Sequence, residues 1–266
     1  MLYTPLTFFK ILSEITKELD IAHTTYSDNW IHELSKGGRH VYIVALRFPL
    51  NMESSAALAR DKTASYSLLR QHNVPVVPHT LISLPVKYVE GSYLSVISKA
   101  ESEYGYPMVI KPNNGLGGKD VMLATNRDEL IMGIEHIHKS ESACISPFVS
   151  SEVEYRVVVL KGKVLIIIGK KPQPPEWRHN MSYGALPILD IAEPLRQQLS
   201  DIACRAAQVM DLAMAAVDIF CETNGILRIL EVNSSVSLLT FSKRSKEHYA
   251  LAKGVYTELV RASLNL

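Results

Sequence analysis

The chain has 266 residues, 47% of them hydrophobic and 21% charged, which suits one large globular domain or two to three small ones. Its 28 lysines and arginines nearly balance its 27 aspartates and glutamates, and no run of like charges forms a tail, so we expect no nucleic-acid partner. Its three cysteines form no Cys-x-x-Cys pair, which argues against a disulfide framework or zinc knuckle and predicts a reducing, cytoplasmic location.

The sequence also argues against a membrane protein. The start, MLYTPLTFFKIL, lacks the basic segment and small-residue cleavage site of a signal peptide. The longest aliphatic run, VLIII at 164–168, is too short to span a bilayer. We therefore expect no membrane association.

Taken in chain order, the apolar spacing predicts helices and strands mixed along the whole chain. Helices are expected at 7–19, 61–73, 97–104, 126–139, 193–212 and 246–264. Strands are expected at 39–46, 108–112, 120–125 and 143–149, with two hairpins at 154–168 and 215–235. Because helices and antiparallel hairpins are mixed, an α+β fold is predicted in preference to a doubly wound parallel sheet.

One glycine-rich segment, YGYPMVIKPNNGLGGKDVMLAT, places Gly115, Gly117 and Gly118 after a strand that ends in Lys111. The Walker A and dinucleotide patterns both fail, because Asp120 stands where one needs Ser or Thr and the other a third glycine. A strand–loop–strand flap remains, in which backbone N–H groups can close over a triphosphate and Lys111 can neutralise phosphate charge. The alternative is an ordinary glycine-rich turn with a surface lysine.

The hairpin near the end of the chain, AAVDIFCETNGILRILEVNSS, carries two acids on apolar strands. An Asn-Gly turn at 224–225 would place Asp218 directly opposite Glu231, with Asn233 on the same face. Like charges at that spacing destabilise a sheet, and hard oxygen ligands suit a divalent cation such as Mg²⁺, which would remove the repulsion. The alternative is a solvated acidic face, or an acid paired with Arg228 or a lysine.

These features follow one another in a characteristic order: ARDKTASYSLLRQHNVPVVP, GYPMVIKPNNGLGGKDV, EYRVVVLKGKV, WRHNMSYGA and DIFCETNGILRILEVNSS. Over about residues 55–266 the sequence resembles the ATP-grasp superfamily, in particular the ribosomal-protein glutamate ligase and lysine-biosynthesis ligase branch. The resemblance implies an ATP-grasp domain at 55–266 whose two α+β lobes enclose ATP. It also implies a shortened N-terminal region at 1–54 and a small lobe at about 100–150 that carries the glycine flap.

The resemblance implies an ATP-dependent carboxylate–amine ligase that forms an amide or peptide bond through an acyl phosphate. Its partners would be small-molecule or peptide carboxylates and amines, most naturally an amino acid or peptide. The rival hypothesis is a non-catalytic, nucleotide-binding regulatory or scaffold protein that kept the fold.

The resemblance also implies roles for individual residues. The nucleotide would be held by phosphate-contacting lysines, the glycine flap, a ribose-binding acid with a neighbouring arginine, and an aromatic side chain at the adenine: Lys62, Lys111, Gly115, Gly117, Gly118, Glu154, Arg156 and Phe148. The catalytic set would be Arg178, Asn180 and Lys111. Magnesium, with Mn²⁺ as an alternative, would be bound by Asp218, Glu231 and Asn233. The alternatives are a surface lysine at the helix start for Lys62, and an exposed strand face for Glu154 and Arg156.

Four features depart from the family pattern. Pro147 stands in the adenine hinge, where it offers no N–H, so adenine contacts would depend on neighbouring backbone and Phe148. Val236 and Ser237 replace the usual Pro-Gly, and Asp120 is expected to place an acid near the phosphates. Because the region before residue 55 is short, we expect a homodimer, a partner protein that completes the substrate site, or an open site.

Overall fold

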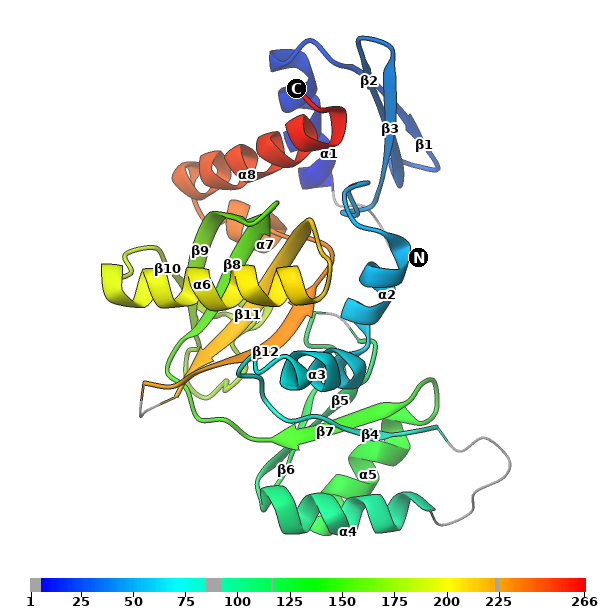
Figure 1. The fold of residues 1–266 in the computed structure, drawn as a ribbon, viewed down its shortest axis with the longest axis vertical. Helices are drawn as coiled ribbons and strands as arrows, with labels where there is room; N and C mark the ends of the chain where they lie inside the picture. The colour runs from blue at the N-terminus through cyan, green and yellow to red at the C-terminus, as the bar shows by residue number, and fades with distance from the viewer. Residues whose placement is uncertain (1–5, 85–91, 116, 223–224) are drawn as a thin grey trace.

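The computed structural model describes residues 6–84, 92–115, 117–222 and 225–266. Within this range the chain forms three antiparallel sheets with helices packed against them, which confirms the α+β prediction (Figure 1). The predicted helices and strands are present, with their ends shifted by a few residues. Among the described residues, each helix is too short or too polar to span a bilayer.

The first and last helices of the described chain pack together. α1 (Leu6–Glu18) and α8 (Lys246–Leu264) lie beside a three-stranded sheet in the order β1 (Ala22–Tyr26), β2 (Ile31–Lys36) and β3 (Arg39–Val44) (Figure 1). Phe8 of α1 meets Tyr256 of α8 edge to face at 5.3 Å between ring centroids, and both are fully buried. The sequence predicted only β3 of this sheet, because β1 and β2 are rich in polar residues.

A five-stranded sheet forms the middle of the molecule. Its strands, in spatial order, are β10 (Leu186–Ile188), β9 (Lys163–Lys171), β8 (Glu154–Leu160), β11 (Met214–Cys221) and β12 (Leu227–Asn233). α6 (Glu193–Val209) covers one face, and the core shared by α1 and α8 reaches the other (Figure 1). All residues of β11 but the last are buried, and because successive side chains point to opposite faces, both faces of this strand are covered. This explains its nearly continuous apolar sequence.

A four-stranded sheet carries the glycine loop. Its strands, in spatial order, are β4 (Thr80–Ile82), β7 (Ala143–Pro147), β5 (Met108–Pro112) and β6 (Met122–Ala124), packed against α4 (Ser92–Tyr104) and α5 (Arg127–Ile137). Alternation along β5 sends Met108 and Ile110 into the core with the helices, and Val109 and Lys111 towards the opposite face. That face is turned towards the five-stranded sheet.

Short helical elements lie in the connections between the larger ones. They are α2 (Glu53–Arg60), α3 (Lys62–Gln71), the 3₁₀ turn η1 (Met181–Tyr183) and α7 (Leu239–Ser242). Asp61 caps α3 by accepting hydrogen bonds from the backbone N–H groups of Thr63 and Ala64. The cap places Lys62 in the first turn of α3, against the glycine loop.

Candidate active site

A cleft with an empty volume of about 860 Å³ lies between the four-stranded and five-stranded sheets. All but one of the residues predicted for the site line it: Lys62, Lys111, Gly115, Gly117, Gly118, Phe148, Glu154, Arg156, Arg178, Asn180, Asp218 and Glu231. The remaining one, Asn233, lines a neighbouring cavity that also contains Glu231. The fold therefore gathers residues that are up to 171 positions apart in the chain (62 to 233).

Two buried lysines line the side of the cleft that is formed by the glycine loop. Lys62 donates hydrogen bonds to the carbonyl oxygens of Gly115, at 2.7 Å, and Asn113, at 3.3 Å. Lys111 is 5% exposed, burial lowers its pKa, and no described residue forms a hydrogen bond or ion pair with its ammonium group. The surface-lysine alternatives are therefore wrong, and Lys111 is a buried cation that a bound anion would stabilise.

A network of four charged side chains crosses the five-stranded sheet. Asp218 accepts hydrogen bonds from Arg156 Nε at 3.0 Å, Arg156 Nη2 at 2.7 Å and Lys170 Nζ at 2.9 Å. Lys170 also pairs with Glu154. Burial favours a protonated Asp218, but Arg156 and Lys170 outweigh it and hold the pKa of that carboxyl well below its usual range. Burial raises the pKa of Glu154 to about 7, so Glu154 is the weaker acid of the two.

The sequence did not point to Lys170 as a site residue. The alternative interpretation of Glu154 and Arg156 placed them on an exposed strand face. All three are in fact largely buried in the hairpin of β8 and β9. A partial signal was present: the turn at Lys161–Gly162 brings Lys170 within one position of Glu154, and a bulge between Val158 and Val159 completes the pairing. The pairing of Arg156 with Asp218, in contrast, depends on β8 and β11 being neighbours.

The two acids of the last hairpin face each other as predicted, because Asp218 is paired with Glu231 across β11 and β12. The register that produces this pairing does not come from a simple two-residue turn alone. Closer to the turn, Ile219 pairs with Ile229, so a bulge at Leu230 shifts the register by one residue. Asn224, predicted as half of the turn, lies outside the described residues. Leu230 itself lines the cleft.

Asn233 completes the acidic cluster. Its amide nitrogen donates to Asp218 at 3.2 Å and to Glu231 at 3.1 Å. Rotation of the amide by half a turn would present its oxygen there instead, so three side chains can direct oxygen donors to one point, as a hard divalent cation requires. No group of three His, Cys, Asp or Glu side chains gathers in the described part of the chain, so the amide has to complete the set. Of the alternatives, Arg228 pairs with Glu222, whereas Asp218 does pair with a lysine.

The segment between β9 and β10 holds Arg178 and Asn180 beside the glycine loop. Glu176 accepts hydrogen bonds from Arg178 Nε at 2.9 Å and Nη2 at 2.7 Å, which lowers the pKa of Glu176 to about 2. The guanidinium lies 3.7 Å from the centroid of the Tyr183 ring. A Cβ atom added to Gly118 would lie 2.8 Å from the Asn180 side-chain oxygen. Gly118 also has φ +77°, so glycine permits both this backbone conformation and the close approach to Asn180.

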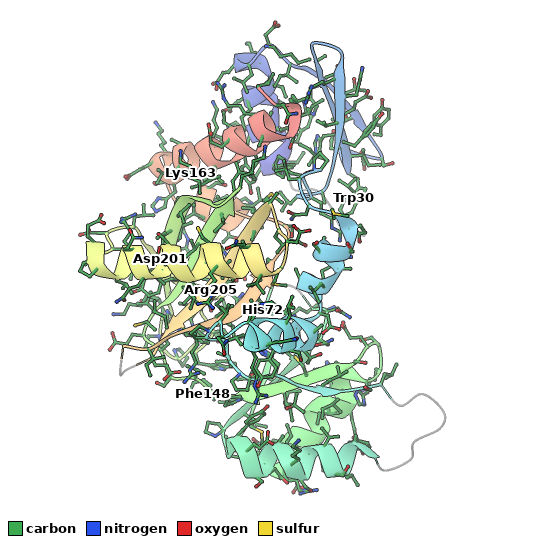
Figure 2. The ribbon with its side chains drawn as sticks, viewed as in Figure 1. Trp30, His72, Phe148, Lys163, Asp201 and Arg205 are labelled. Atoms are coloured by element: carbon green, nitrogen blue, oxygen red, sulfur yellow. The ribbon has the colours of Figure 1, made fainter. Side chains whose placement is uncertain are left out.

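The predictions for the adenine hinge and for Asp120 have different outcomes. Phe148 lines the cleft as predicted, where the chain passes from the four-stranded to the five-stranded sheet (Figure 2). Its ring meets Trp177 edge to face at 5.8 Å, and its N–H donates to the carbonyl of Pro107, so that N–H is already satisfied. The prediction for Asp120 is wrong: its carboxylate faces His136 at 3.4 Å, away from the cleft.

The apolar lining of the cleft includes residues that the sequence did not single out. They are Val77, Val109, Val121, Val149, Phe220 and Leu230. Together with Phe148 and Trp177 they add apolar surface to a cleft that is also lined by lysines and acids. Such a lining suits a ligand that combines a flat, uncharged ring with an anionic group.

Comparisons with known proteins agree with this arrangement. A family model described as the RimK-like ATP-grasp domain matches residues 59–253. A probable alpha-L-glutamate ligase of Pseudomonas fluorescens (strain Pf0-1) is 31% identical over 199 residues, which cover 72% of this chain and 60% of the relative. A protein of the same name from Shewanella halifaxensis is 28% identical over 195 residues, covering 71% and 39%. The chain thus spans about 60% or less of the length of these relatives.

Two solved structures share the fold. The D-alanine–D-alanine ligase of Bacillus anthracis complexed with ATP aligns with a TM-score of 0.59 at 19% identity, over 79% of this chain and 68% of that one. The ATP-grasp ligase PsnB complexed with minimal precursor aligns with a TM-score of 0.55 at 20% identity, over 77% and 64%. Because the family model covers most of the chain, the chain belongs to the RimK-like ATP-grasp family.

Proposed function

We propose that this protein is an ATP-dependent carboxylate–amine ligase that forms an amide or peptide bond on an amino acid or peptide. The observation that carries the proposal is the cleft itself. In it, the buried ammonium of Lys111, which lacks a partner among the described residues, shares one cavity with the oxygen cluster around Asp218 and Glu231. A nucleoside triphosphate with a divalent cation satisfies both groups.

Each group of residues has a defined task in this proposal. Lys62, Lys111 and the backbone N–H groups of the glycine loop would bind the phosphates, and Glu154 would bind the ribose. The oxygen cluster fits Mg²⁺, with Mn²⁺ as an alternative, and the cation would neutralise phosphate charge and make the transferred phosphoryl group more electrophilic. The apolar side of the cleft, with Phe148, would hold the adenine.

The proposed reaction has two steps. A substrate carboxylate oxygen attacks the γ-phosphorus, the bond to the bridging oxygen breaks, and ADP leaves. An amine then attacks the acyl carbon of the acyl phosphate, inorganic phosphate leaves, and the nitrogen loses a proton. Arg178 and Asn180 would offset the negative charge that develops on the transferred group, once Arg178 turns from Glu176 towards the phosphate.

The proposal extends to the setting of the enzyme. All three cysteines are free in the structure, in keeping with the reducing cytoplasm that we propose. The acceptor and donor would be small molecules or peptides. A homodimer or a partner protein that completes the substrate site stays a prediction, as does the division into a short N-terminal region at 1–54 and an ATP-grasp domain at 55–266.

The test is the substitution Glu231→Ala with Glu135→Ala as its control. Glu231 belongs to the oxygen cluster, whereas Glu135 is an exposed acid on α5. We expect Glu231→Ala to abolish ADP release with Mg²⁺, ATP and a panel of amino acids and short peptides, while circular dichroism shows the fold intact. Glu135→Ala should behave as the unaltered protein.

Two outcomes would contradict the proposal. Unchanged ADP release in Glu231→Ala would remove the site assignment. Nucleotide binding by the unaltered protein without ADP release, across a broad panel of carboxylates and amines, would favour the non-catalytic regulatory or scaffold protein.

A further inference from the structure

A second cavity, with an empty volume of about 1110 Å³, adjoins the nucleotide cleft. The two share five lining residues, at the place where the oxygen cluster and the glycine loop meet: Gly117, Arg156, Lys170, Asn180 and Glu231. A molecule in the second cavity would therefore reach the residues proposed to hold the terminal phosphate of ATP. This is the position from which a carboxylate can attack that phosphate.

The two cationic side chains that line this second cavity already have ion-pair partners. Arg156, Lys170 and Glu231 are its only charged lining residues in the described part of the chain. Arg156 and Lys170 are both hydrogen-bonded to Asp218, and Lys170 also pairs with Glu154. No lining cation is left over to pair with a further anionic group of a ligand.

Away from the shared wall, the lining is uncharged. Four hydroxyl groups face the cavity and have no hydrogen-bond partner among the described residues: those of Ser182, Ser235, Ser237 and Thr240. Between them lie apolar side chains: Leu46, Met181, Leu238 and Phe241. A lining of free hydroxyls and aliphatic or aromatic carbon suits a ligand that is polar or apolar but not ionised.

The hydroxyl-bearing segment is held rigidly in place. Val236 is fully buried, its carbonyl accepts a hydrogen bond from the Tyr256 hydroxyl, and that hydroxyl accepts one from the N–H of Leu238. Ser237 between them is exposed to the cavity. The Val-Ser pair, which departs from the family pattern, thus anchors the segment through Val236 and presents the Ser237 hydroxyl.

We propose that the second cavity binds the carboxylate substrate, and that the part of this substrate beyond its reacting carboxylate is uncharged. The inference rests on the proposed ligase function and narrows its substrate class. A second carboxylate, such as that of a glutamyl side chain, would meet hydroxyls and apolar carbon here but no cation that is free to pair with it, so the lining favours uncharged groups over it. Hydroxyl-bearing and aliphatic side chains meet no such penalty.

The test measures acyl phosphate formation directly. Hydroxylamine attacks an acyl phosphate and gives a hydroxamate and inorganic phosphate, so no natural amine is needed. The full chain is offered Mg²⁺, ATP and hydroxylamine with N-acetyl-L-threonine or N-acetyl-L-methionine, and in parallel with N-acetyl-L-glutamate or Nα-acetyl-L-lysine. We expect kcat/KM to be at least ~10-fold higher for the uncharged pair, because leaving a charged group unpaired loses about 1.4 kcal/mol or more.

The substitution Ser237→Arg supplies the missing cation, with Ser54→Arg as its control. Ser237 lines the second cavity, whereas Ser54 is an exposed serine on α2. We expect Ser237→Arg to raise the ratio of kcat/KM for N-acetyl-L-glutamate over N-acetyl-L-threonine by ~10-fold, and Ser54→Arg to leave it unchanged. If Ser237→Arg does not fold, Thr240→Arg makes the same test from another point of the lining.

The outcomes separate this inference from the proposed function. A preference of the unaltered protein for N-acetyl-L-glutamate, or a ratio that the folded arginine variant leaves unchanged, overturns the inference while the ligase activity stands. If no acid gives a hydroxamate, the ligase proposal itself is contradicted. Calorimetric titration of the same four acids, in the presence of a non-hydrolysable ATP analogue, then tests the second cavity separately. Tighter binding of the two uncharged acids supports the inference, and tighter or equal binding of the two charged acids overturns it.

Discussion

Lys111 shows at the scale of one residue how binding and stability oppose each other. Its ammonium is buried in the cleft, and none of the described residues pairs with it. An unpaired buried charge destabilises the free protein, and an anionic ligand reverses that effect. A lysine in such a position is therefore better explained by a ligand than by the fold.

The substitution Lys111→Met should separate the two effects. Because a hydrogen bond to a charged group contributes about 1.5–3 kcal/mol, we expect the affinity for Mg²⁺–ATP to fall by roughly 10- to 100-fold. The free energy of unfolding without ligand should stay equal or rise, since the methionine carries no charge. Calorimetric titration and urea unfolding measure the two quantities. Lys139→Met, at an exposed lysine, should change neither, and unaltered ATP affinity in Lys111→Met would remove the phosphate-binding role.

At the scale of an element, the loop between β5 and β6 depends on its glycines in different ways. Gly118 has φ +77° and lies so close to Asn180 that a Cβ atom would approach the amide oxygen to 2.8 Å. Gly162, in the turn between β8 and β9, has the same φ of +77° but nothing within 4 Å of such an atom. A residue with a side chain would therefore meet the same backbone strain at both positions, and only at Gly118 would it also meet a close contact.

We expect Gly118→Ala and Gly162→Ala to lose similar stability, about 1–2 kcal/mol, because an L-residue is disfavoured at this backbone conformation. Only Gly118→Ala should also impair the reaction, since Asn180 has to move from the place where the loop packs against it. Unfolding in urea measures the first effect, and kcat and KM for ATP measure the second. Equal kinetics in the two variants would contradict a role for this contact in catalysis.

At the scale of the whole molecule, the last helix links the N-terminal sheet to the substrate side of the cleft. Tyr256 of α8 packs on Phe8 of α1, while its hydroxyl holds Val236 and Leu238 beside the second cavity. Helix α1, the three-stranded sheet and the last helix are therefore parts of one core. This shared core lies beside Leu46, which lines the second cavity.

The substitution Tyr256→Phe tests this link. It leaves the buried N–H of Leu238 without its acceptor, so we expect the free energy of unfolding to fall by about 1–3 kcal/mol. Tyr249→Phe is the matched control on the same helix, because the hydroxyl of Tyr249 bonds the partly exposed Glu14 and its loss should cost less than about 1 kcal/mol. Urea unfolding compares the two, and equal losses would show that the segment is held by packing alone.

Much of the local structure could be predicted because it depends on short-range patterns. The spacing of apolar residues predicted α8 with its observed limits, and apolar runs on either side of a glycine turn predicted the hairpins. The pairing of Asp218 with Glu231 was predicted from the hairpin, although the bulge at Leu230 that produces the register was not. The bulge escaped notice because an extra strand residue leaves no periodic signal.

The sequence by itself determined the order of motifs, the family and the residue types that meet in the cleft. Only the tertiary structure decided that Lys111 is buried without a partner, that Lys170 joins Glu154 to Asp218, and that Asp120 turns to His136. It alone also brought α1 against α8 and opened the second cavity. The physical reason is range: turns and periodicity act between residues close in the chain, whereas strand order, burial and ion pairing result from apolar contacts summed over the whole fold.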